Sequence, residues 1–393
     1  MPQNNIVLVL DATQRSALAV TRSIGSLSDS FVITTDSCEL TIAGSSRYSD
    51  IYIQSPSAKY EPEAFIVWLR DVIVKHSINL LMPMTEVTSQ LILMSQASLP
   101  EVSIPFATYE QVLQLADKSK LTKTAIELDI PVPQTSFFNN RDELEIDKLK
   151  YPCVLKPALS QIYKEGKWLG TEVRIVKSES ELLSFMEKDA YLQFSPFMIQ
   201  EFIPGHGAGV FCYYNKGVPK AFFAHSRLRE KPPSGGVSVL SESVEVNEKL
   251  KQYAVSLLDS VNWHGVAMVE FRLDYHGKAY LMEVNTRFWG SLQLAIDSGV
   301  DFPRWVYSSE FGDKLNLKNI YKTGQRLRWL LGDLDSLYIF LKSRDNSFVE
   351  KIGRVFQFFV GNSFNCKHEV NRWNDIKPAI TELKLYIRDL LGK

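Results

Sequence analysis

Two acidic side chains lie in neighbouring strand-like runs near the middle of the chain. The runs 266–274 and 278–285 are rich in apolar and β-branched residues and are separated by a short turn that ends in His276-Gly277. A two-residue loop at His-Gly, with the glycine at positive φ, would close a hairpin. In that register Glu270 lies directly opposite Glu283.

The opposed carboxylates predict a cation site. Asn285 lies two residues beyond Glu283 and so on the same face of its strand. Carboxylates that face each other repel, so a bare pair would be destabilising. Mg²⁺ takes such oxygen ligands, together with phosphate oxygens and water. Glu270, Glu283 and Asn285 are therefore candidate metal ligands; the alternative is a solvated strand face that carries charges.

The first part of the chain predicts a parallel α/β sheet. Short apolar runs alternate with helix-length amphipathic stretches up to about residue 116. The runs are 6–10, 31–34, 51–53 and 80–82. The loop 11–15 lacks the glycines of a dinucleotide fingerprint, which argues against a NAD site there. We expect this domain to shape a substrate pocket.

The remainder predicts two further parts. A helix over 117–129 is closed by two prolines within 130–133, which force an extended chain. Mostly antiparallel strands follow over 151–285, and a final amphipathic helix falls near 378–391. The expected fold class is therefore α/β and α+β. The predicted domains are 1–116, 117–312 (a small lid subdomain at about 117–200, then a larger catalytic part at about 201–312) and a mainly helical segment 313–393.

Bulk composition excludes several classes of function. The 393 residues include 44 Lys and Arg against 45 Asp and Glu, so no excess charge favours nucleic acid. No apolar run approaches the length of a membrane span. Four scattered cysteines show no C-x-x-C spacing, which fits a reducing cytoplasm.

The run Glu283-Val-Asn-Thr-Arg287 resembles the metal-and-phosphate motif of the ATP-grasp superfamily, written Glu-x-Asn-x-Arg. Glu270 matches that family's first metal ligand. The resemblance covers about residues 117–306 and implies ATP with Mg²⁺, two ions as a rule and Mn²⁺ as an alternative. It also implies that Arg287 stabilises the transferring phosphoryl group or binds the substrate carboxylate. The segment before residue 117 resembles the domain that usually precedes an ATP-grasp fold.

The same resemblance assigns a nucleotide site. Lys118, at a helix start, and Lys156, at a strand end, match two lysines that bind the nucleotide phosphates. The run Gln200-Glu201-Phe202-Ile203 resembles the hinge strand that binds adenine, with the Glu201 carbonyl and the Ile203 N–H as the reading groups.

A basic run over 225–231 places His225, Arg227, Arg229 and Lys231 on one face at period two. It predicts an anion-binding edge, with a solvated edge strand as the alternative. Arg229 or Arg287 would stabilise the oxyanion of the reaction. His225 and His264 are candidate bases by residue type alone.

This basic run, together with Phe288-Trp-Gly-Ser291 and the run 326–333, resembles a branch of predicted carboxylate-amine ligases. Such ligases join a small-molecule carboxylate to an amine through an acyl phosphate. One alternative is a biotin-independent ATP-dependent carboxylase. Another is a non-catalytic nucleotide-binding regulator, because the loop 158–170 carries only two glycines. That loop is expected to act as a lid, with donors at Ser160, Lys164 and Lys167. A homodimer is possible, and neither nucleic acid nor a membrane is expected as a partner.

Overall fold

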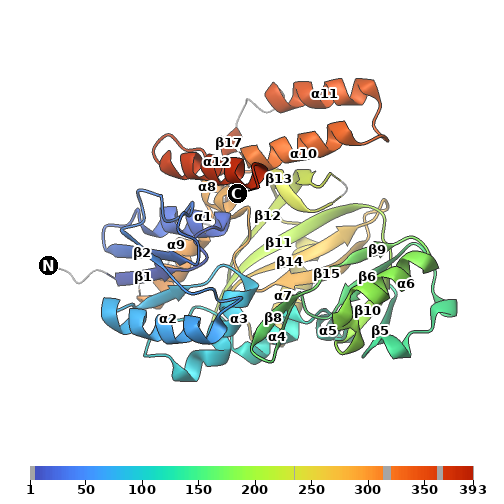
Figure 1. Ribbon diagram of the computed structural model, residues 1–393, viewed down its shortest axis with the longest axis horizontal. Coiled ribbons are helices and arrows are strands. Elements are labelled where there is room, and N and C mark those ends of the chain that lie inside the picture. The colour runs from blue at the N-terminus through green and yellow to red at the C-terminus, as the bar shows by residue number, and fades with distance from the viewer. Residues whose placement is uncertain (1–4, 234, 313–319, 361–365, 393) are drawn as a thin grey trace.

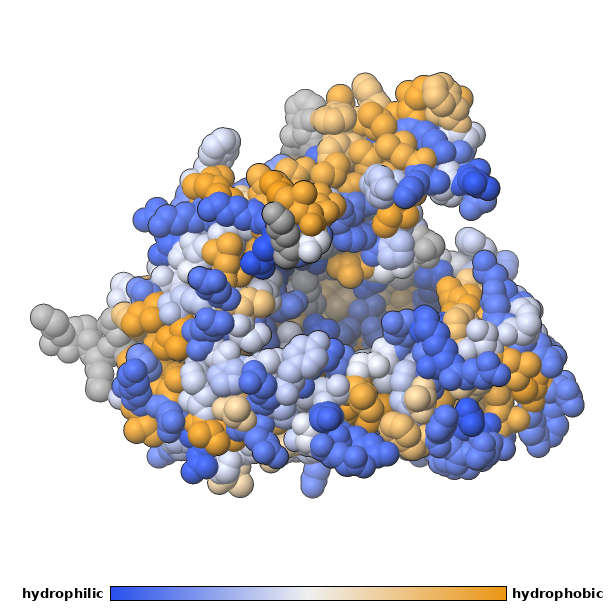
Figure 2. Space-filling model, in the orientation of Figure 1, coloured by the Kyte–Doolittle hydropathy of each residue, from blue (hydrophilic) through white to orange (hydrophobic). Residues whose placement is uncertain are grey.

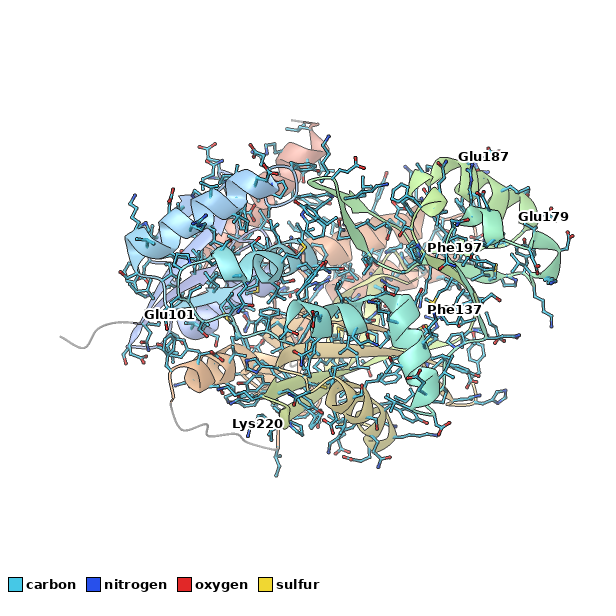
Figure 3. All side chains as sticks on the ribbon, turned by 90° about the horizontal axis from the view of Figure 1, so that it is seen from below. Glu101, Phe137, Glu179, Glu187, Phe197 and Lys220 are labelled. Carbon is cyan, nitrogen blue, oxygen red and sulfur yellow. The ribbon has the colours of Figure 1, made fainter. Side chains whose placement is uncertain are left out.

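The computed structural model describes residues 5–233, 235–312, 320–360 and 366–392. Figure 1 shows an N-terminal layer on one side, a small sheet on the other, a large sheet between them and helices above. In the view from below, Glu101 marks the N-terminal side, whereas Glu179 and Glu187 mark the outer helix of the small sheet (Figure 3). The predicted mixed α/β class is confirmed, while the domain boundaries stay predictions; residues 313–319, at the expected start of the last part, lie outside the described residues.

The N-terminal sheet is parallel, as predicted. Its strand order is β3-β2-β1-β4. The strands are β1 Asn5–Val9, β2 Ser30–Asp36, β3 Ile51–Gln54 and β4 Leu80–Met82, and the helices are α1 Arg15–Ile24, α2 Pro62–His76 and α3 Glu86–Ser95. The last three residues of β1 and all of β4 are buried, because helices cover both faces of the sheet.

A small antiparallel sheet follows, with the order β5-β10-β6-β9. Its strands are β5 Thr135–Phe138, β6 Cys153–Pro157, β9 Arg174–Val176 and β10 Phe197–Glu201, with α6 Glu179–Lys188 against it. The expected lid loop is a hairpin of β7 Gln161–Lys164 and β8 Lys167–Gly170. Trp168 on this hairpin is buried in the core of the N-terminal layer beside Phe65 and Leu91, so the hairpin bridges the two parts.

The large sheet has the order β15-β14-β11-β12-β13-β16-β17. Its strands are β11 His206–Asn215, β12 Val218–Lys231, β13 Val237–Val244, β14 Gly265–Leu273, β15 Ala279–Asn285, β16 Arg326–Arg328 and β17 Cys366–His368. One face packs on helices α4 Tyr109–Ala116, α5 Lys118–Glu127 and α7 Glu248–Ser260. The other face packs on α1, α8 Leu292–Ser298 and α9 Phe302–Glu310. The N-terminal layer and the large sheet thus share one hydrophobic core.

The β14–β15 hairpin reaches the predicted register by an unpredicted route. Its loop has three residues, Tyr275 to Gly277, closed by the Asp274 N–H to Lys278 carbonyl bond of 3.0 Å. The predicted two-residue loop is therefore wrong. A β-bulge at Met282 shifts the register back by one residue, so Glu270 does lie opposite Glu283.

The C-terminal part contributes helices and two edge strands. Its helices are α10 Leu330–Lys342, α11 Phe348–Phe359 and α12 Lys377–Leu390. Helix α11 exposes a row of large apolar side chains, visible as the apolar surface at the top of Figure 2. They are Phe348, Val349, Ile352, Phe356 and Phe359. Within the described part of the chain, no helix combines the length and apolarity needed to span a bilayer.

A buried ion pair joins the C-terminal part to α1. Arg22 Nε lies 2.8 Å from Asp375 Oδ2, and its other nitrogens donate to the carbonyl oxygens of Glu369 and Val370. Asp375 also accepts from Ser46 Oγ and from the N–H of Arg47. Both charged side chains are at least nine-tenths buried.

Replacing Asp375 with Ala is expected to destabilise the fold by about 3–5 kcal/mol, because a buried Arg22 guanidinium loses its counter-charge. The measurement is urea unfolding followed by tryptophan fluorescence. The control is Asp345→Ala at an exposed site. An unfolding midpoint equal to that of the control would show that this ion pair does not hold the C-terminal part.

Candidate active site

The carboxylates of the β14–β15 hairpin lie at the centre of a dense charge cluster. Glu270 Oε2 is 2.6 Å from Arg227 Nη2, and Glu270 Oε1 accepts from Asn285 Nδ2 at 3.0 Å. Burial and the facing Glu283 raise the pKa of Glu270, while Arg227 opposes that rise. Glu283 is the more open of the two, with 36% of its side chain exposed.

This donor set fits a divalent cation. A cation between Glu270 and Glu283 would stabilise the ionised form of Glu270, which burial and the charge of Glu283 disfavour. Asn285 offers an amide oxygen beside them, which is 3.4 Å from Arg287 Nη2. Among the described residues no cluster of three His, Cys, Asp or Glu side chains is placed to hold a metal alone. A cation held there would take further oxygen ligands, such as phosphate oxygens and water.

Both predicted lysines lie near the end of the hairpin that carries Glu283. Lys118 Nζ lies 4.0 Å from Glu283 Oε2 and donates to Ser160 Oγ at 2.7 Å. Lys156 Nζ donates to the carbonyl oxygen of Met282, the bulged residue, at 3.2 Å. Burial lowers the pKa of Lys156 to about 8, partly offset by Glu283. The β-bulge thus supplies both the register of the carboxylates and an anchor for one lysine.

A cavity of about 360 Å³ lies beside Lys156. Predicted nucleotide residues line it, namely Lys156, Gln200, Glu201, Phe202 and Ile203, and so do both hairpin carboxylates. Apolar side chains of Val154, Ile175 and Phe271 form its walls. A planar base with a charged tail suits this combination of apolar walls and one cationic end.

A second cavity of about 440 Å³ lies on the far side of the same carboxylates. Glu270, Glu283 and Arg227 line both cavities. Asn285, Arg287 and Trp289 line only the second, as does Arg15 from the N-terminal layer. The centre of the face shown in Figure 2 is correspondingly hollowed between the three parts.

The sequence of this region is similar to those of known proteins. Residues 193–331, which contain all three predicted metal ligands, match the family described as "ATP-grasp in the biosynthetic pathway with Ter operon". The chain is 23% identical over 227 residues to D-alanine–D-alanine ligase of Aquifex aeolicus (strain VF5), covering 54% of this chain and 74% of that one. By the family match the chain contains an ATP-grasp region at residues 193–331. The predicted resemblance is thereby confirmed.

Other matches widen the range of ATP-grasp relatives. The alpha subunit of mitochondrial methylcrotonoyl-CoA carboxylase of Mus musculus is 24% identical over 258 residues; these cover 60% of this chain but only about a third of the subunit (33%). An L-amino acid ligase from Bacillus licheniformis has a TM-score of 0.60 at 18% identity, covering 79% and 75% of the chains. The biotin carboxylase domain of Hydrogenobacter thermophilus 2-oxoglutarate carboxylase, solved with MgADP, ADP and bicarbonate, scores 0.64 at 14% identity, covering 83% and 74%. These structural likenesses establish the ATP-grasp fold.

Two charged residues near this site, Arg15 and Glu86, were not predicted from the sequence. Arg15, at the start of α1, is held by the carboxylate of Glu369, and its Cζ lies 4.0 Å from the centroid of the Trp329 ring. Glu86 begins α3; burial raises its pKa, and the charges of Lys118 and Arg287 oppose that rise. An acid four residues after the end of a buried strand, at a helix start, was the available signal for Glu86. Arg15 depends on contacts with residues more than 300 positions away.

Arg229 lies away from both cavities, contrary to the period-two pattern of the basic run. The register of β12 shifts at Leu228, so Arg227 pairs with Ser241 and Arg229 with Leu240. Neighbouring residues on a strand point to opposite faces, so the bulge sends Arg229 to the face opposite Arg227. Of the two arginines, Arg227 contacts Glu270 of the hairpin, and Arg229 does not line either cavity.

The two histidines are poorly placed for base catalysis. Burial, and to a smaller extent Arg227, lowers the pKa of His225 to about 3, so its ring is neutral at pH 7. Its Nε2 lies 2.9 Å from Ser291 Oγ. His264 accepts from the N–H of Lys216 and lines neither cavity. His225 is therefore a polar wall of the second cavity at neutral pH.

Because the pKa of Lys156 is lowered to about 8, its ammonium loses its proton as pH rises through that value. The affinity for MgATP is expected to fall over the same range, because the phosphates lose a cationic partner. Lys156→Arg should remove most of this pH dependence, since a guanidinium stays charged. Calorimetric titration with MgATP from about pH 7 to about pH 9.5 measures both.

Lys156→Ala should weaken MgATP binding already at neutral pH, by about tenfold or more. Lys148→Ala is the matched control, since that side chain is exposed on the same subdomain. An unaltered pH profile in Lys156→Arg would remove Lys156 from the nucleotide site.

Proposed function

We propose that the chain is an ATP-dependent carboxylate-amine ligase that forms an acyl phosphate and releases ADP and phosphate. The observation that carries this proposal is the meeting of two cavities at one pair of carboxylates. The first cavity suits a nucleotide, and the second has room for a small substrate. Glu270 and Glu283 line both, so the terminal phosphate and a substrate would meet between them.

The residues that line the first cavity support nucleotide binding there. The base would lie between the apolar side chains near Ile203, with its edge against the backbone of the hinge strand β10. Lys118 and Lys156 would then contact the phosphates, since both ammonium groups converge on the carboxylate end. Charge-assisted contacts of this kind both bind the nucleotide and offset its charge.

Glu270, Glu283 and Asn285 would hold Mg²⁺. When bound, the ion supplies charge neutralisation for the nucleotide phosphates. Two ions, rather than one, are the expectation for this motif. Arg227 fixes Glu270 in place from the side at 2.6 Å, which limits the movement of that carboxylate.

Substrate chemistry would take place in the second cavity. The substrate carboxylate attacks the γ-phosphorus of ATP, so the P–O bond to ADP breaks as the acyl phosphate forms. The amine then attacks the acyl carbon, and phosphate leaves. Arg287 lines the cavity beside Asn285 and is placed to stabilise the negative oxygens of both steps. The β7–β8 hairpin, seated on the N-terminal layer through Trp168, would limit the access of water to the intermediate.

A second candidate is an ATP-dependent carboxylase, in which bicarbonate is the activated carboxylate. The match to a methylcrotonoyl-CoA carboxylase subunit favours it, as does the fold shared with a biotin carboxylase domain. The two reactions share the activation step and differ in the acid that is activated.

Trapping with hydroxylamine distinguishes these functions, because it captures an acyl phosphate whatever the natural amine is. Purified protein is incubated with ATP, Mg²⁺, hydroxylamine and pools of carboxylates, and ADP and hydroxamate are both followed. Hydroxamate with ADP from one pool supports the ligase. ADP that appears only with bicarbonate, without hydroxamate, favours the carboxylase, and ATP binding without either product would point to a regulatory relative.

The natural amine, the homodimer and the cytoplasmic location stay predictions. The homodimer has a physical candidate surface in the exposed apolar side chains of α11. One biotin carboxylase domain of the same fold was solved as a dimer.

Glu283→Gln is expected to abolish ATP turnover with the trapped carboxylate, because a neutral amide replaces a metal ligand. The fold should be intact, since Glu283 is partly exposed. The control is Glu187→Gln on the outer side of α6, marked in Figure 3. Turnover at the control rate would remove Glu283 from the metal site.

A further inference from the structure

Three arginines converge on one aspartate where the C-terminal helices meet the large sheet. Asp333, on α10, lies 2.7 Å from Arg328 of β16 and 2.8 Å from Arg354 of α11. Arg229 of β12 approaches the same carboxylate at 3.1 Å. The four residues come from four different elements, so the cluster forms only where these elements pack together in the folded chain.

The cluster carries an uncompensated positive charge. Asp333 is fully buried, and Arg328 and Arg354 are at least nine-tenths buried. Three guanidiniums on one carboxylate leave two positive charges in excess. The nearby cations Arg326 and Lys231 already have their own partners, Glu242 and Asp335.

Within the described residues no further carboxylate contacts the three arginines. Burial lowers the pKa of Arg229 to about 10, opposed by Asp333, while the other two arginines lower it further. Buried charge without a counter-charge costs several kcal/mol per ion, so a bound anion would be strongly favoured.

The same side chains hold unused hydrogen-bond donors. Arg229 Nε, Arg328 Nη2 and Arg354 Nη1 are buried and have no hydrogen-bond partner. Arg229 Nη2 is near enough to Asp333 for an ion pair but does not form a hydrogen bond with it. Buried donors of this kind are normally satisfied, so their number at one place indicates a missing acceptor.

We propose that Arg229, Arg328 and Arg354 bind a phosphate group. A phosphate dianion matches the excess of two charges, whereas a monocarboxylate would leave one uncompensated. Its oxygens can accept from several guanidinium forks at once, as planar donor pairs require. The site is separate from the catalytic centre, because the bulge at Leu228 turns Arg229 to the face opposite Arg227.

Occupancy of this site would stabilise the attachment of the C-terminal helices. The phosphate would link β12 and β16 of the sheet to α11, which otherwise buries only Arg354 and Phe358. Phe358 packs against the same cluster, with Arg328 Cζ 4.2 Å from its ring centroid. Strand β12 also carries Arg227, the partner of Glu270, so the two sites are joined by one strand.

Thermal unfolding at constant ionic strength tests the proposal with inorganic phosphate and with glycerol phosphate, against chloride. Both phosphates are expected to raise the Tm of the wild-type chain, and calorimetry should then give a dissociation constant. Arg354→Met should weaken this binding by at least about tenfold. Arg326→Met is the matched control, two residues from Arg328 on the same strand and in a separate ion pair.

Further variants keep the test decisive. Arg354→Lys retains a positive charge but loses the planar pair of guanidinium donors. The variant should therefore fold, but its affinity for phosphate should fall at least about tenfold. Lys156→Met should leave the response intact, because that residue belongs to the nucleotide site. A stronger response to glycerol phosphate than to inorganic phosphate would identify a phosphorylated metabolite as the ligand; equal responses would identify free phosphate. The proposal is overturned if chloride serves as well as phosphate, if Arg354→Lys binds like wild type, or if Lys156→Met alone abolishes the response.

Discussion

The side chains of Glu270 and Glu283 repel each other across two paired strands, and the neighbouring charged groups offset that repulsion. Arg227 binds Glu270 from the side, and Lys118 approaches Glu283 from a different element. Burial, and after it the charge of Glu283, raises the pKa of Glu270 and so disfavours its ionised form. A site that is strained without a cation is well prepared to bind one together with a polyanionic nucleotide, because binding removes an energetic cost that the fold already carries.

This arrangement depends on parts of the chain that are distant in sequence. Arg15 enters the second cavity from the N-terminal layer, but Glu369 and Trp329 of the C-terminal part hold it there. The ion pair between Arg22 and Asp375 joins the same two parts. The C-terminal part therefore contributes to the geometry of the second cavity, even though it supplies none of the predicted metal ligands.

The sequence was most informative where chemistry follows from a local pattern. The opposed carboxylates, both lysines and the hinge strand were predicted. The structure places the carboxylates, Lys156 and the hinge strand around one cavity, and Lys118 beside Glu283. The loop length of the hairpin was wrong, yet a bulge at Met282 restored the register. A similar bulge at Leu228 had the opposite effect and removed Arg229 from the site. Bulges depend on packing across the sheet, and the contacts of Arg15 depend on tertiary structure, so neither can be obtained from periodicity alone.

The most direct test of the central claim is calorimetric titration of the protein with ATP, once with Mg²⁺ and once with excess EDTA. The account holds that Glu270 and Glu283 bind the nucleotide phosphates through a divalent cation. MgATP should therefore bind much more tightly than metal-free ATP, whose phosphates would meet two carboxylates without a bridging charge. Equal affinity in the two titrations would contradict the account, because the opposed carboxylates would then have no part in nucleotide binding.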